Sequence, residues 1–128
     1  MTYHISKKVN YGFDDAIEKV TAELKEEGFG VLTEIDVKAT LKKKLDVDFR
    51  RYTILGACNP GFAYQALQHE NKIGTMLPCN VIVEEQDDGT VEVSAVDPMA
   101  SMQAVENADL AGIASEVKRK LEKVIESV

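Results

Sequence analysis

The segment "PCNVIVEEQDDGTVEVSAV", residues 78–96, constrains the fold more than any other part of the chain. Two valine-rich runs flank Asp88-Gly89, and an Asp-Gly pair between such runs is a strong signal for a β-hairpin. Two strands joined by so short a turn must be antiparallel. The sheet therefore contains at least one antiparallel pair, and the regular alternation of an α/β wrap fits the sequence less well.

Three further strands and two long helices are predicted from hydrophobic periodicity. Apolar residues recur with helical spacing from Phe13 to Leu24, and again from Leu110 to Val128. The strands are expected at 3–9, 29–37 and 50–58, and short helices are expected to follow Asp36, Asn59 and Asp97. This order predicts a single α+β domain over residues 1–128, in which a five-stranded antiparallel sheet carries both long helices on one face.

Two expectations concern the faces of individual strands. Simple alternation in the second strand places Val31, Thr33 and Ile35 on one face, together with Val37. In the third strand, apolar residues point both ways, so both faces of that strand are expected to be covered. One face of the sheet lacks enough helix to cover it, which predicts a homodimer.

The only two cysteines are expected at one end of the sheet. Cys58 ends the third strand and Cys79 begins the fourth, so antiparallel pairing brings them together, whereas parallel pairing would separate them by a strand length. Asn59 and Asn80 follow the cysteines, and Asp97 ends the fifth strand nearby. We call these five residues the rim. Helices starting at Pro60 and Pro98 would direct free N–H groups toward it and favour an anion or a thiolate.

Each rim residue also has an ordinary structural interpretation. Free cysteines are often buried in cores, and Asn59 and Asp97 are both sufficiently explained as helix caps. Met99 and Met102 lie near the rim in the predicted fold, but methionine is more often a packing residue. His4 would reach the rim only if the first strand borders the fifth.

Composition limits the possible partners. The formal net charge of −7 disfavours nucleic acid and acidic membrane surfaces. No apolar run approaches the ~18 residues of a membrane span, and the start "MTYHISKK" lacks the apolar stretch of a secretory signal. The expected compartment is the cytoplasm, where the two cysteines would stay reduced.

Standard catalytic motifs do not match. Gly56 and Gly61 begin a phosphate-loop pattern that fails at Phe62, and G-x-S-x-G, H-E-x-x-H and C-x-x-C do not occur. A zinc site would need His4, His69, Asp97 or a second subunit to complete four ligands. The basic residues between Lys38 and Arg51 are interpreted as a solvated surface rather than as an anion site.

Four segments carry a resemblance to a known family. "EEGFGVLTEIDVKATLKKKL", "YTILGACNPGFAYQAL", "LPCNVIVEE" and "VDPM" together resemble the prokaryotic family named domain of unknown function three-hundred-and-two. The resemblance implies one α+β domain with a sheet like that of the TATA-box-binding protein, and a dimer. It implies no established activity and no DNA binding.

Three hypotheses remain open. The first is a homodimeric binding module whose rim, Cys58, Asn59, Cys79, Asn80 and Asp97, takes a soft metal ion or a small anion. In that case Cys58, Cys79 and Asp97 would be the ligands of zinc or another soft metal. The second is a thiol-redox enzyme in which Cys58 attacks and Cys79 resolves the mixed disulfide. The third is a purely structural or partner-binding domain.

Overall fold

The computed structural model describes residues 2–128. Over this range the protein is α+β, with one antiparallel sheet in the order β1-β5-β4-β3-β2. The strands are β1 (His4–Val9), β2 (Gly30–Asp36), β3 (Tyr52–Cys58), β4 (Cys79–Glu85) and β5 (Val91–Val96). The helices are α1 (Phe13–Glu26), α2 (Val37–Leu45), α3 (Pro60–His69), the 3-10 helix η1 (Ile73–Met76), α4 (Pro98–Ser101) and α5 (Asp109–Ser127).

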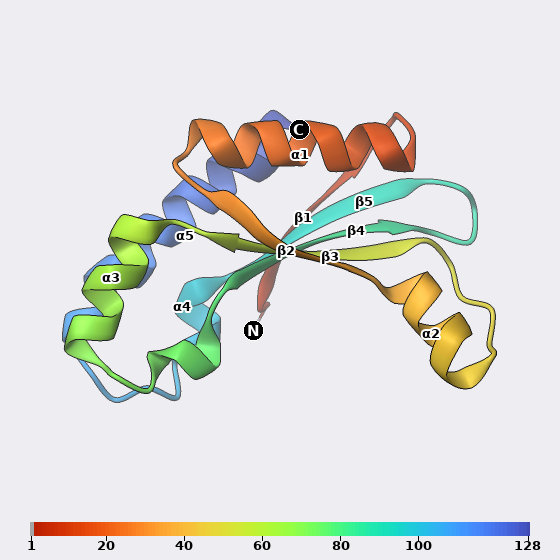
Figure 1. Ribbon diagram of the computed structural model, residues 1–128. Helices are drawn as coiled ribbons and strands as arrows, with labels where there is room; N and C mark the ends of the chain where they lie inside the picture. The colour runs from red at the N-terminus through yellow and green to blue at the C-terminus, as the bar shows by residue number, and fades with distance from the viewer. Residues whose placement is uncertain (1) are drawn as a thin grey trace.

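Both long helices pack on the same face of the sheet, as predicted (Figure 1). Helix α1 buries Ala16, Val20 and Leu24 completely, and α5 contributes Leu121 and Val124 to the same core. Burial of each such side chain stabilises the fold by roughly 1.5–3 kcal/mol before entropy is counted. Helix α1 ends as expected at Gly28, whose φ of +87° lies in the left-handed region.

The predicted face of β2 was wrong because the strand contains an irregularity. Val31 pairs with Ala57, but Thr33 pairs with the adjacent Gly56, so Leu32 is an extra residue in the ladder. Such a bulge reverses the alternation of side chains beyond it. Val31 therefore packs against the helix-covered core, whereas Thr33 lies over Gly56 on the other face.

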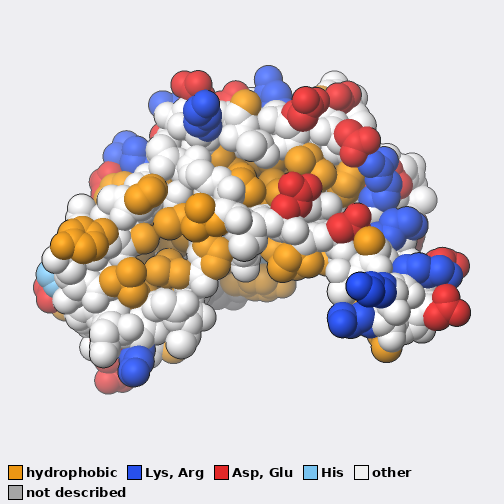
Figure 2. Space-filling view, viewed as in Figure 1, with side chains coloured by type: hydrophobic (Ala, Val, Ile, Leu, Met, Phe, Trp, Pro, Cys, Tyr) orange, Lys and Arg blue, Asp and Glu red, His pale blue; other side chains and the backbone are white. Residues whose placement is uncertain are grey.

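The opposite face of the sheet carries no long helix and forms the underside of an arch in Figures 1 and 2. We call it the open face. In β3, Leu55 and Ala57 are fully buried beneath the helices, while Tyr52 and Ile54 remain partly exposed on the open face. The second face of β3 is thus only partly covered. The members of the open face on β3, β4 and β5 are Tyr52, Ile54, Gly56, Asn80, Ile82, Glu84, Glu92, Ser94 and Val96.

A second, smaller apolar cluster lies at one end of the molecule. Ala66, Ile73 and Leu110 form its buried centre, and Leu77 and Met102 pack against it. These residues come from α3, η1, α5 and the connections between them. This cluster is separate from the main core beneath α1 and α5.

No helix within residues 2–128 combines the length and the apolar character that crossing a membrane requires.

Candidate functional site

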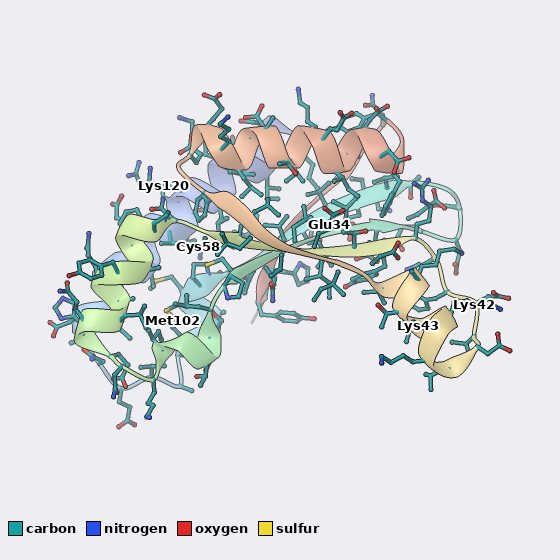
Figure 3. The ribbon with its side chains drawn as sticks, in the orientation of Figure 1. Glu34, Lys42, Lys43, Cys58, Met102 and Lys120 are labelled. Carbon is teal, nitrogen blue, oxygen red and sulfur yellow. The ribbon has the colours of Figure 1, made fainter. Side chains whose placement is uncertain are left out.

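The two cysteines lie at the same end of the sheet, as the antiparallel arrangement predicts. Ala57 pairs directly with Cys79 across β3 and β4, and Cys58 is the next residue of β3. Both cysteines are free and half-buried, and both line one cavity. Figure 3 shows Cys58 where β3 continues into α3. Neighbouring strand ends therefore bring two thiols into a shared space.

This cavity, which we call the sulfur cavity, is small and apolar. Its volume is about 30 Å³, room for roughly two water molecules if one needs ~10–15 Å³. No charged side chain lines it. Its walls come from β3, β4, α3, α4 and α5, and they consist of Phe29, Ala57, Cys58, Asn59, Phe62, Ala63, Ala66, Leu77, Pro78, Cys79, Pro98, Met102, Ile113, Ala114 and Val117.

The surroundings keep the Cys79 thiol protonated at neutral pH. Burial in the apolar cavity, with a smaller contribution from the neighbouring Cys58, raises the pKa of Cys79 to about 11. A thiol with so high a pKa is a weak nucleophile at pH 7, because the thiolate is the reactive form. A metal ion that displaces the proton can bind a thiol of this kind.

The two asparagines of the rim have different positions. Asn59 lines the cavity and occupies the N-cap position of α3, but its side chain does not cap that helix. Instead its Nδ2 donates to the carbonyl of Glu27 at 3.3 Å, which ties α3 to the end of α1. The predicted capping role of the Asn59 side chain was therefore wrong. Asn80 is exposed and lines a hollow of the open face.

Asp97 has the predicted capping role and an additional ionic partner. Its Oδ1 accepts hydrogen bonds from the backbone N–H groups of Met99 at 2.9 Å and Ala100 at 3.4 Å. Its Oδ2 lies 3.0 Å from Nζ of Lys118, and this carboxylate raises the pKa of Lys118. Asp97 is not among the residues that line the sulfur cavity.

Met102 lines the cavity beside the two cysteines, a position that periodicity alone does not distinguish from packing. Figure 3 shows it behind α3, in the region between that helix and η1. The described residues contain no group of three or more histidine, cysteine or carboxylate side chains arranged to hold a metal ion.

The other candidate residues lie away from the cavity. His4 is on β1, which does border β5, but its Nδ1 contacts Ser6 Oγ at 2.6 Å beside the open face. His69 is partly exposed, with Nδ1 3.5 Å from a carboxylate oxygen of Asp109.

The basic residues near α2 are dispersed among acidic partners. Lys42 pairs with Asp46 at 2.9 Å, and Arg51 pairs with Asp14 at 2.7 Å. Arg50 pairs with Glu84 at 3.2 Å and stacks on two aromatic rings. These three basic side chains therefore pair with carboxylates at three separate positions, which agrees with the interpretation of a solvated surface.

A family model that matches nearly the whole chain identifies the family to which the protein belongs. The model of the family described as "Domain of unknown function DUF302" matches residues 5–128. The chain belongs to the DUF302 family. A crystal structure of an uncharacterized conserved DUF302 protein from Bacillus stearothermophilus superposes with a TM-score of 0.92 at 29% identity. The alignment covers 99% of this chain and 98% of that one.

No curated protein matches the chain significantly. Membership of DUF302 therefore establishes the α+β fold and the family, while the description of the family names no activity.

Proposed function

We propose that this DUF302 protein binds a soft metal ion in the sulfur cavity. The observation that carries the proposal is that both cysteine residues line one small cavity, with Cys58 near enough to raise the pKa of Cys79. Thiolate ligands prefer soft ions, and two such ligands from adjacent strand ends are held by the ladder of the sheet. The protein would then act as a binding module that takes up and holds the ion.

The character of the cavity favours a metal ion over a small anion. An anion buried in an apolar space needs a positive partner or several donors to replace its hydration. No Lys or Arg side chain lines the cavity. A metal cation offsets the charge of the thiolates that bind it: two thiolates neutralise a divalent ion, and with a monovalent ion they leave a single net negative charge spread over the sulfur ligands.

Replacing either cysteine is expected to abolish tight ion binding. For Cys58→Ser and Cys79→Ser we expect affinity for Ag(I), a soft probe ion, to fall at least about 100-fold, since even an outer-shell partner is worth ~10–100-fold. The measurement is an anaerobic competition titration with a chromophoric chelator. Asn80→Ser is the matched control, because Asn80 follows Cys79 but does not line the cavity.

The variant Asp97→Asn distinguishes a metal site made only of sulfur ligands from a site in which the Asp97 carboxylate also binds the ion. We expect this variant to keep its affinity for Ag(I) while losing part of the stability that the cap and the Lys118 pair provide. A wild-type protein that binds no Ag(I), or cysteine variants that bind it as well as wild type, would refute the proposed function.

The thiol-redox alternative requires the site to rearrange. The two sulfurs are not at disulfide-bonding distance, so a bridge between Cys58 and Cys79 would need a shift of the strand ends or of α3. The raised pKa of Cys79 also makes it a slow partner in thiol exchange. Metal binding needs no bond between the two sulfurs, and for this reason we favour it.

We also propose that a second copy of the chain covers the open face. Tyr52, Ile54, Ile82 and Val96 give this face apolar side chains, and a hollow of about 340 Å³, which Glu84 and Glu92 also line, lies along it. In a two-fold interface these side chains would meet those of the second copy, so apolar side chains would face apolar side chains. The uncovered face is the observation that supports the homodimer.

Ile82→Lys is expected to convert a dimer into a monomer at micromolar concentration, because it places a charge among these apolar side chains. Sedimentation equilibrium measures the mass directly. Leu67→Lys is the matched control, since Leu67 is an exposed apolar residue on α3, outside the open face. A wild-type protein that sediments as a monomer would remove this part of the proposal.

A further inference from the structure

One methionine, Met102, lines the sulfur cavity, and a second, Met99, lines the adjoining groove. Three of the four belong to η1, α4 and the residue that follows α4: Met76, Met99 and Met102. Met76 and Met99 are 39% and 40% exposed, although apolar side chains of this size are usually buried. Met99 and Met102 are three residues apart, and both line the same groove.

Met102 separates the cavity from an outer groove. That groove has a volume of about 190 Å³, and Met99, Met102, Leu110 and Ala114 are among its lining residues. Met102 and Ala114 also line the sulfur cavity. The groove and the sulfur cavity therefore adjoin at Met102 and Ala114, and Met99 lines only the groove.

Three sulfur atoms suit one class of ion better than others. Thiolate and thioether ligands together favour monovalent copper, whereas zinc prefers four ligands drawn from thiolates, imidazoles and carboxylates. The carboxylate of Asp97 is already held by two backbone N–H groups and Lys118. Among the described residues no third cysteine, histidine or carboxylate completes a group with Cys58 and Cys79.

On the basis of the proposed function, we infer that the sulfur cavity is selective for Cu(I), with Met102 as the third ligand. We further infer that the Met99 groove is the uptake route. On binding, the thiols of Cys58 and Cys79 each release a proton to solvent and form a bond to the ion, while the Met102 thioether donates a lone pair without losing a proton. No electron transfer is involved, because the ion enters and remains as Cu(I).

The test compares equilibrium affinity with loading rate. The protein is titrated anaerobically with Cu(I) against bicinchoninate, and separately with Zn(II) against a zinc indicator. We expect Met102→Leu to weaken Cu(I) binding about tenfold or more and to leave Zn(II) affinity unchanged. We expect Met99→Leu to slow loading in stopped-flow several-fold with no change in equilibrium affinity. Met76→Leu is the control, because Met76 is equally exposed but lines neither space.

X-ray absorption of the wild-type Cu(I) complex provides a measurement that does not depend on any variant. Three sulfur neighbours around copper would support the inference, and two would overturn it. Unchanged Cu(I) affinity in Met102→Leu would also overturn it, while the loss of Ag(I) binding in the cysteine variants would still support the proposed function. Zn(II) binding tighter than Cu(I) binding would reject the selectivity. An unchanged loading rate in Met99→Leu would reject the route.

Discussion

Gly56→Ala is expected to destabilise the protein by about 1–3 kcal/mol, the usual cost of overpacking a tightly packed site. A Cβ at Gly56 would lie 2.2 Å from Oγ1 of Thr33 and 2.9 Å from Cγ of Pro78. Neither neighbour can move freely, because Thr33 is β-branched and fixed in β2 and Pro78 is a closed ring. Urea unfolding followed by circular dichroism measures the loss directly.

Two further variants test whether close contact with Thr33 causes the loss of stability in Gly56→Ala. Thr33→Ala removes the closer contact, so Gly56→Ala should cost less in that background, and the difference is the coupling free energy of the pair. Gly112→Ala is the matched control: nothing lies within 4 Å of a Cβ there, and the residue is inside α5. This control should stabilise the protein by roughly 0.5–1 kcal/mol. Equal stability of Gly56→Ala and wild type would contradict the packing described here.

Affinity for a soft ion is expected to rise about 1000-fold or more between pH 6 and pH 9. Below its pKa of about 11 the Cys79 thiol is protonated, so an ion must displace that proton. Because one proton must be displaced from Cys79, the apparent binding constant for the ion rises about tenfold with each unit of pH. Competition titrations at several pH values, corrected for protonation of the chelator, give the slope. A flat profile would show that the thiols are already ionised.

Alkylation provides a check without any metal. In Cys58→Ser, Cys79 is the sole thiol, and its reaction with iodoacetamide should be slow at pH 8 and should accelerate up to about pH 11. Burial is the main cause of the raised pKa, so the effect survives the loss of Cys58. Rapid labelling at pH 7 would contradict the buried environment, and it would favour the thiol-redox alternative.

Local sequence signals predicted most of the fold. The Asp-Gly turn fixed the direction of β4 and β5, and pairing of β3 with β4 then placed Cys58 beside Cys79. Asp36 and Asp97 cap their helices as their positions before α2 and α4 predicted. These features depend on residues close together in the sequence, so periodicity and capping rules were sufficient.

The features that could not be predicted depend on distant contacts. The bulge at Leu32 has no local signal, because Val31, Thr33 and Ile35 alternate as in a regular strand. The side chain of Asn59 bonds to Glu27, which lies 32 residues earlier. The cavity walls supplied by α5 and by Met102 likewise come from helices far from the cysteines in sequence, so the cavity could not be inferred from either strand end.

The small cluster around Ala66, Ile73 and Leu110 has an energetic consequence for the sulfur atoms. It buries far less apolar surface than the core beneath α1 and α5, so the region of α3 and η1 can separate at a fraction of the free energy of global unfolding. Phe62 and Ala66, which line the cavity from α3, would leave it in such an opening. We therefore expect a subglobal opening to increase the exposure of the two half-buried cysteines while the main sheet remains folded.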